Sequence, residues 1–414
     1  MAEELDSLED LNVEIEDVEE EFESEEEFSD DESFDADEAE ESSFLSQLML
    51  PARFTIKSER SYQLKDENEL KNNRASFRLE YSKYFGTYFF IQLDTKLNAF
   101  LADDHRAKAE NSEGVYETNT KEAFLQMSFG NTSIKLGMQN MIWGEADGGA
   151  ITDVISPRDY SELFFISLEE SRIGQMMVVL DQYTEIGDWS LFYIPDPKFN
   201  AYPKEGTAYY VGIPEISTDE KETEYGVRWK KTFGKSDIAF MMASLIENSV
   251  VNRYSMVGTT FNYARGNFLY KGEIAHKTSK SFYNAYYQII KKDVLDAALG
   301  AEYSPGGTYT LGLEAVNSHI ADWEEGLQSV KEDTSSTTLT WSKTYLNEDL
   351  SLNWMSSFGN SMKMIMHSLR TSYKWNDNLT FELNAFYPDI RDEASEYWVY
   401  RDQKQIALKF QVQF

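Results

Sequence analysis

The sequence of 414 residues contains no cysteine, few histidines and no long hydrophobic run. The absence of thiols excludes disulfides, zinc–cysteine sites and cysteine catalysis, and it suits a chain that crosses an oxidising compartment. The longest apolar runs, such as AFMMASLI at 239–246, are far shorter than the roughly 18 residues of a transmembrane helix. Hydropathy alone would therefore predict a soluble protein. However, a barrel strand has an apolar face that mean hydropathy does not detect, because polar residues alternate with the apolar ones.

Positive charge is missing from the N-terminal part of the chain. Residues 1–42 hold 23 Asp and Glu and no Lys or Arg, so they carry −23 of the net charge of −35. The remaining residues hold 50 acids against 38 bases. This balance argues against nucleic acid as a partner, because phosphates require a basic surface. We expect an acidic low-complexity extension at 1–43 and a folded region at 44–414.

The acidic extension has two interpretations. Self-repulsion and few apolar residues favour disorder. Alternatively, a helix forms there when it docks on a periplasmic or exporter protein, because apolar residues recur at spacings of three and four. This candidate docking seam comprises Leu5, Leu8, Leu11, Ile15, Val18 and Phe22, with Val13 as an exception. The first residues do not resemble a signal peptide, and we assume that one has been removed.

From residue 51 onward, apolar and polar residues alternate, as they do across the two faces of a strand. The last ten residues, QIALKFQVQF, place Ile406, Leu408, Phe410, Val412 and Phe414 on one face, opposite Gln405, Ala407, Lys409, Gln411 and Gln413. The segments 74–83 and 224–233 have the same design. Aromatic residues make up 14% of the chain, which is typical of a β-rich core or of the aromatic girdles of a membrane barrel.

Turn residues divide this region into eighteen candidate strands. They lie near 51–62, 74–84, 87–101, 119–129, 132–142, 172–183, 187–195, 222–233, 236–248, 253–265, 266–278, 292–304, 307–319, 334–345, 348–358, 362–375, 378–389 and 401–414. Connections after even-numbered strands are tight and contain Gly or Asn, as in FGT and WNDN. Most connections after odd-numbered strands are long, for example 102–118 and 196–221.

Alternating short and long connections are typical of transmembrane barrels, whereas a β-sandwich has no need of them. We therefore predict an all-β fold, a transmembrane antiparallel up-and-down β-barrel of about 18 strands, within a range of 14–18. Closure removes the sheet edges that a membrane does not tolerate. The predicted location is the outer membrane of a Gram-negative bacterium, with lipid against the apolar face and both termini in the periplasm. The alternative is a soluble β-sandwich whose last strand is buried.

The C-terminal residue is an aromatic one, Phe414. A terminal strand that ends in Phe resembles the signal by which outer-membrane barrels are recognised for assembly. The resemblance implies the barrel assembly machinery as a partner.

The connection at 143–171, after the fifth strand, is the candidate functional loop. General porins place a loop that folds into the pore at this point, and that resemblance implies a constriction. The candidate lining groups are Glu145, Asp147, Asp153, Arg158, Asp159, Glu162 and Arg172. Opposite charges across a narrow lumen select solutes by size and polarity. The alternative is an external loop packed over the barrel mouth.

The same segment carries a motif. A strand leads into Trp143 and Gly144, the run DVISPRD follows at 153–159, and Arg172, Gly174, Pro195, Pro197 and Pro203 come later. This pattern resembles a largely uncharacterised family of proteobacterial outer-membrane barrels, often encoded beside resistance-nodulation-division-type exporters of hydrophobic compounds. GGAITDVISPRD stands where an Asn-Pro-containing version is expected, and the acidic extension is not part of the pattern. The resemblance implies passage or hand-over of a hydrophobic or lipid-like molecule.

Catalytic, cofactor and metal sites have little support. The histidines His105, His276, His319 and His367 are scattered, and no pair has metal-ligand spacing. No phosphate-binding loop is present, and acidic pairs such as Asp103–Asp104 either bind calcium loosely or are merely solvated. An enzyme on the barrel would need a Ser–His or Asp–His pair at its outer rim. We therefore predict no catalytic residue, no cofactor and no metal.

The functional prediction is a porin-like channel for small solutes or hydrophobic molecules. The alternative is a barrel that receives lipid-like cargo from a periplasmic or inner-membrane exporter through its acidic extension.

Overall fold

The computed structural model describes residues 52–64, 69–146, 151–162, 170–210, 222–247, 252–286, 288–327, 330–359, 363–393 and 396–414. The predicted acidic extension with its docking seam, and Asp147 of the candidate loop, lie outside these residues.

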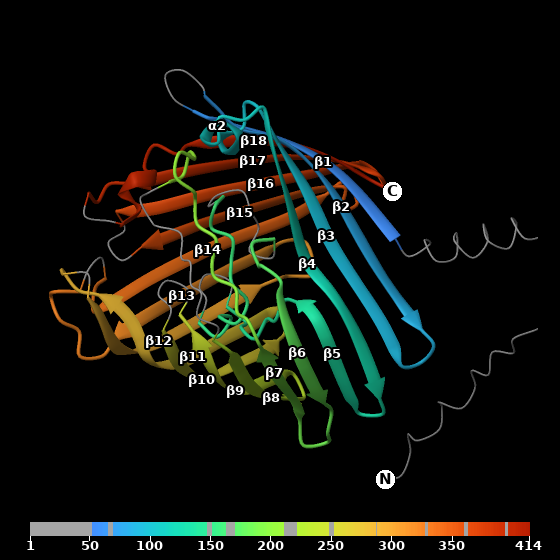
Figure 1. Ribbon diagram of the computed structural model, residues 1–414, viewed down its shortest axis with the longest axis vertical. Helices are drawn as coiled ribbons and strands as arrows, with labels where there is room; N and C mark the ends of the chain where they lie inside the picture. The colour runs from blue at the N-terminus through green and yellow to red at the C-terminus, as the bar shows by residue number, and fades with distance from the viewer. Residues whose placement is uncertain are drawn as a thin grey trace, which may run out of the picture. The chain divides into compact units, whose positions relative to one another are not determined.

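The described residues form eighteen antiparallel strands, as predicted. Their bounds are β1 Ala52–Gln63, β2 Glu69–Phe85, β3 Phe89–Leu101, β4 Gly114–Phe129, β5 Thr132–Gln139, β6 Gln175–Gln182, β7 Asp188–Ile194, β8 Glu224–Phe233, β9 Ser236–Ile246, β10 Arg253–Arg265, β11 Phe268–Tyr283, β12 Ile289–Tyr303, β13 Thr310–Ile320, β14 Asp333–Tyr345, β15 Leu350–Gly359, β16 Met364–Asn376, β17 Leu379–Ile390 and β18 Gln405–Gln413. Each strand pairs with the next, and β1 pairs with β18 (Figure 1). The sheet is therefore a closed barrel.

The two ends of the barrel differ in their connections. Tight turns follow the even-numbered strands, and glycines such as Gly86 and Gly130 adopt the positive φ that these turns need. The opposite end holds the longer connections, with the short helices α2 (His105–Ala109) and η1 (Glu396–Tyr400). The alternation pattern predicted neither helix. No described helix is long and apolar enough to span a membrane.

Alternation places apolar residues outside the barrel, as β18 shows. Leu408 and Phe410 are exposed on the outer surface, whereas Gln405 and Lys409 are buried on the inner side. The outer face continues around the barrel with Phe240, Leu313 and other large apolar side chains. The predicted apolar outward face and polar inward face of the last strand are confirmed.

The prediction of a polar inner face on every strand is wrong for part of the wall. In β9, Ala239, Met241 and Leu245 are buried on the inner side, while Phe240 and Met242 are exposed on the outer side. Inward-facing residues of β6, β7 and β10 to β12 join the same hydrophobic cluster. Both faces are apolar because the connection between β5 and β6 covers the inner one, as the next section describes.

Candidate functional site

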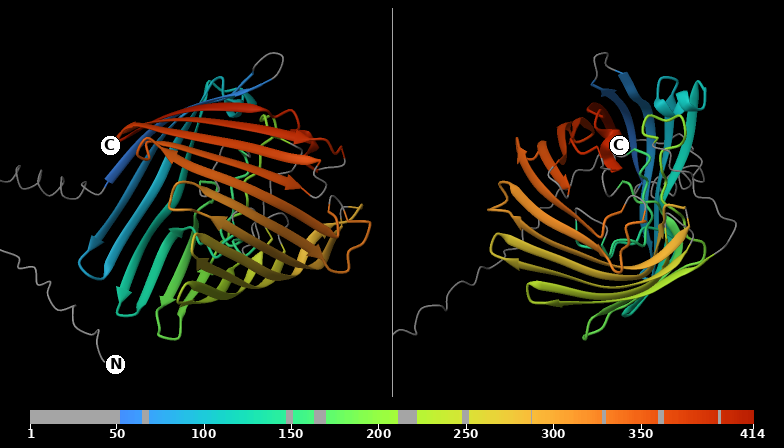
Figure 2. Two further views of the ribbon diagram at one scale, coloured as in Figure 1. Left: turned by 180° about the vertical axis from the view of Figure 1, so that it is seen from behind. Right: turned by 90° about the vertical axis from the view of Figure 1, so that its left-hand side faces the viewer.

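The connection between β5 and β6 lies inside the barrel (Figure 2). We call its described parts, 140–146, 151–162 and 170–174, the lumenal loop. Ile151 and Ile155 are almost fully buried in one cluster with the inward-facing Met241 and Met256. The apolar residues of the loop thus fill one side of the lumen.

A single carboxylate of the barrel wall holds the first part of the lumenal loop. Glu273 of β11 is 2% exposed. Its Oε1 accepts hydrogen bonds from the backbone N–H of Glu145 and, at 2.6 Å, from that of Ala146. Its Oε2 accepts from the N–H of Thr152 at 3.1 Å and from the Thr152 hydroxyl at 2.8 Å. Four donors of the loop therefore converge on one side chain.

Three of the predicted lining groups form a buried ion cluster instead. The Asp153 carboxylate receives Arg158 Nη2 at 2.7 Å and Arg172 Nη2 at 2.6 Å. The backbone at Arg158 and Arg172 is bridged antiparallel, with the Asp159 N–H donating to Ser171 O at 2.6 Å. All three ionic side chains are buried. This triad joins two halves of the loop to each other.

The glycines and the tryptophan of the sequence motif are closely packed around the lumenal loop. A Cβ at Gly144 would lie 2.8 Å from Cβ of Asp153, and a Cβ at Gly174 would lie 2.1 Å from the backbone oxygen of Lys121. The ring of Trp143 packs edge-on against Phe192 at 5.2 Å. The two glycines are therefore required by close approach of the backbone to its neighbours, which gives a physical reason for these residue types.

A second ion cluster surrounds Glu162. Its Oε1 is 3.1 Å from Arg74 Nη1, 3.2 Å from Arg106 Nε and 3.0 Å from His105 Nε2. Burial would raise the pKa of Glu162, but Arg74, His105 and Arg106 outweigh burial and hold this pKa well below its usual range. Asp104, the N-cap of α2, also binds Arg74. The cluster ties the loop to β2 and α2.

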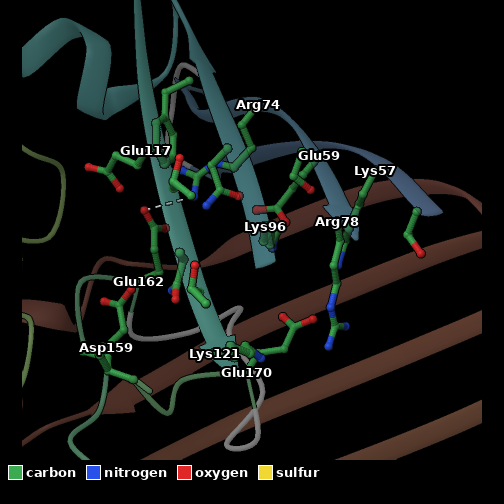
Figure 3. A pocket seen from close by; sticks show the side chains of 18 of the residues that line it. Lys57, Glu59, Arg74, Arg78, Lys96, Glu117, Lys121, Asp159, Glu162 and Glu170 are labelled. Atoms are coloured by element: carbon green, nitrogen blue, oxygen red, sulfur yellow. Dashed lines mark ion pairs between the residues drawn. The ribbon is translucent and has the colours of Figure 1, made fainter. Parts of the chain in front are cut away.

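The other side of the lumen contains a polar cavity of about 760 Å³ (Figure 3). It lies along β1 to β4 and β18 and is bounded by the lumenal loop, α2 and residues 198–201. Nine Lys or Arg and six Asp or Glu line it, with only four apolar residues, Phe100, Met138, Ile173 and Ala201. The cavity wall therefore carries more positive than negative charge, although the chain as a whole is strongly acidic.

Strand register arranges these charges in rows across the wall. One row runs from Lys409 through Glu59 and Arg74 to Phe100. The guanidinium carbons of Arg74 and Arg106 lie 4.9 and 4.7 Å from the centre of the Phe100 ring. Both arginines thus rest on the same aromatic side chain, which fixes their position at the edge of the cavity.

The predicted lining residues therefore divide into groups. Asp159 and Glu162 line the cavity. Asp153, Arg158 and Arg172 do not, because they neutralise one another in the buried triad. Glu145 contributes a backbone donor to Glu273. The sequence pattern does not single out Lys57, Lys96, Lys121 and Lys409 of the wall, nor Glu170 of the lumenal loop. The inward positions of the four lysines follow from strand alternation, but their proximity depends on register.

The described histidines have local partners. His319 lies 3.0 Å from Asp333, and His367 accepts or donates a hydrogen bond with the hydroxyl of Ser356 at 2.5 Å. Ser356 is 0% exposed, so its hydroxyl is covered from both lipid and water. Among the described residues, no group of three or more His, Cys, Asp or Glu could hold a metal ion.

The closed antiparallel barrel with a long connection inside its lumen has the fold of outer-membrane porins. Among solved structures, OccAB1 of Acinetobacter baumannii superimposes with a TM-score of 0.56 and 8% identity over 88% of this chain and 96% of that one. OccK8 (OprE) and opdK of Pseudomonas aeruginosa each give a TM-score of 0.53 with 9% identity, and cover 88% of this chain. They cover 97% and 98% of those chains, respectively.

No protein-family model and no curated protein sequence matches the chain. At identities of 8–9%, the likeness to solved structures concerns the fold. The resemblance to the exporter-associated barrel family therefore stays a prediction.

Proposed function

We propose that the chain is an outer-membrane channel through which small hydrophilic solutes diffuse along the charged side of the lumen. The observation that carries this proposal is the polar cavity, whose lining is charged at fifteen positions. A volume of about 760 Å³ is within the range of about 300–1,000 Å³ typical of small-molecule sites. A hydrated, charged wall favours solutes that are themselves polar.

The lumen has little accessible apolar surface for a hydrophobic molecule. The inner wall has an apolar surface formed by residues of β6, β7 and β9 to β12, but the lumenal loop packs on that surface and covers it. The remaining polar cavity has few apolar contacts for a lipid-like cargo. We therefore favour hydrophilic solutes over the hydrophobic molecules that the sequence resemblance implies.

Aromatic residues at the tight-turn end support placement in a membrane. Large exposed aromatic side chains lie in or beside these turns on the outward side, namely Tyr88, Phe129, Phe233, Phe268, Tyr345 and Trp375. Such rings partition to the interface between hydrocarbon and water. They form a belt at one end of the apolar outer surface, as expected of an outer-membrane barrel.

Single-channel conductance in planar bilayers tests the proposal. The full chain and a chain lacking residues 1–43 should both give steady conductance steps in KCl. Heat-modifiable migration on gels would first establish that each preparation is folded. A folded barrel that conducts no current in either form would contradict the proposal, and the hypothesis of cargo hand-over through the acidic extension would then be favoured.

A further inference from the structure

Lysines gather on one part of the cavity wall. Lys57, Lys96, Lys121 and Lys409 extend into the cavity from β1, β3, β4 and β18. Lys57 pairs across the sheet with Ser76, and Lys96 pairs with Arg78 of the same strand, β2. Lys57 and Lys96 thus lie on either side of β2 with an offset of two residues, so their Cα atoms are about 12 Å apart at the usual strand spacing and rise. Their long side chains can reach a common small ligand.

Most cations of this wall already have a partner. Arg78 binds Asp94 with contacts of 2.7 and 2.6 Å, Lys409 lies 3.2 Å from Glu59, and Arg74 contacts Glu162. By contrast, no described side chain forms a hydrogen bond or an ion pair with the ammonium group of Lys57 or Lys96. Two partly buried ammonium groups therefore retain their hydrogen-bond donors for a ligand.

One carboxylate of the lumenal loop faces this lysine cluster. Glu170 points into the cavity, lies beside Lys121 and directs its carboxylate toward Arg78 (Figure 3). Burial would raise the pKa of Glu170, but Lys57, Lys96 and the other two lysines outweigh burial and lower this pKa to about 2. Glu170 is therefore ionised at neutral pH and interacts with the whole cluster.

We propose that the lysine cluster binds the oxyanion group of a small solute, and that Glu170 is a built-in competitor for this site. A dicarboxylate or an inorganic oxyanion can accept charge-assisted hydrogen bonds from the ammonium groups of Lys57 and Lys96. Glu170 supplies the same chemical group from within the chain, so it neutralises the cluster in the absence of solute and weakens anion binding. The passage of such anions rests on the proposed channel function, whereas their binding does not.

Substitutions that leave the fold intact can test this competition. Glu170→Gln removes the competing charge at constant size, and Lys57→Gln and Lys96→Gln each remove a cation that forms no direct hydrogen bond or ion pair with a described side chain. Glu185→Gln, in the tight turn between β6 and β7, is the matched control because it removes one negative charge away from the cavity. The probes are succinate and sulfate, two dianions with different oxyanion groups.

Calorimetric titration of the folded chain in detergent measures binding directly, and block of chloride current in bilayers measures it during conduction. Glu170→Gln should tighten binding of at least one probe roughly fivefold or more, since coupling free energies between sites are commonly of that size. Lys57→Gln and Lys96→Gln should weaken binding by a similar factor, and Glu185→Gln should leave it unchanged. A difference between the probes would identify the preferred oxyanion group.

Two results would overturn the inference. Unchanged affinity in Glu170→Gln would show that this carboxylate does not compete, and unchanged affinity in both lysine variants would show that the cluster is not the site. Binding without any conductance would contradict the channel but leave the anion site in place. Conductance with no binding of either probe, and no block, would contradict the anion site alone.

Discussion

Replacing Glu273 by glutamine removes one of the two carboxylate oxygens that hold the lumenal loop against β11. The carboxylate accepts four hydrogen bonds, two at each oxygen. A glutamine carbonyl can still accept from Glu145 and Ala146, but its amide group then faces the N–H of Thr152. The Thr152 hydroxyl can rotate and accept from that amide. The N–H of Thr152 cannot, so it becomes an unsatisfied buried donor.

The cost can be estimated from these contacts. A buried polar group left unsatisfied costs about 1–3 kcal/mol, and a hydrogen bond to a charged group contributes about 1.5–3 kcal/mol. We therefore expect Glu273→Gln to destabilise the docked loop by about 3 kcal/mol. The β11 ladder keeps its backbone hydrogen bonds, so the loss should be local to the loop and leave the barrel closed.

Hydrogen exchange measured by mass spectrometry checks this prediction at the amides of Ala146 and Thr152. Both should exchange on the order of a hundredfold faster in Glu273→Gln, since 1.4 kcal/mol corresponds to a factor of ten. Glu302→Gln is the control, because Glu302 is a carboxylate of the neighbouring strand that pairs with Lys271 and not with the loop. Unchanged protection of Ala146 and Thr152 in Glu273→Gln would refute the reasoning.

Four further changes have defined outcomes. Asp153→Asn should destabilise the loop by about 3–5 kcal/mol, because it leaves two buried guanidiniums without their anion. Equal melting temperatures of Asp153→Asn and Asp159→Asn would contradict this prediction. Gly174→Ala should lower the melting temperature, because its Cβ would lie 2.1 Å from the backbone oxygen of Lys121, whereas Gly326→Ala should not, because nothing lies within 4 Å of a Cβ there. Deleting Phe414 removes two backbone hydrogen bonds to Phe54, and should lower refolding yield while Phe414→Tyr preserves it. The ionised carboxylate of Glu170 stabilises the fold fully above its ordinary pKa of 4.5. This contribution is lost as the pH falls toward the lowered pKa of about 2. Between these two values, the melting temperature of Glu170→Gln should therefore depend less on pH than that of the unsubstituted protein.

The sequence predicts the strands well because alternation is a local property. Each of the eighteen predicted strands overlaps an observed one, although β2 and β4 each begin five residues earlier than predicted. The tight turns contain glycines whose backbone requirement is visible in the chain itself. Strand number, antiparallel order and outward face all follow from this short-range information.

The candidate site is predicted less well because it depends on long-range packing. Inward-facing apolar residues such as Met241 contradict simple alternation until the lumenal loop covers them. Asp153, Arg158 and Arg172 have the composition of a pore constriction, but mutual neutralisation lets them be buried. The lysine cluster comes from strands at both ends of the chain, and only the pairing of β1 with β18 brings them together.

The cavity wall has a consequence for the order of assembly. The wall includes β18 together with β1 to β4, and the pairing of β1 with β18 is the contact that closes the sheet. Lys409 reaches Glu59 across this seam. Until the two ends of the chain meet, the charged cavity lacks one of its sides, even if the loop has already packed on β7, β9 and β10. The pairing that closes the sheet therefore also completes the cavity, so a chain whose ends have not met would be an open sheet without it.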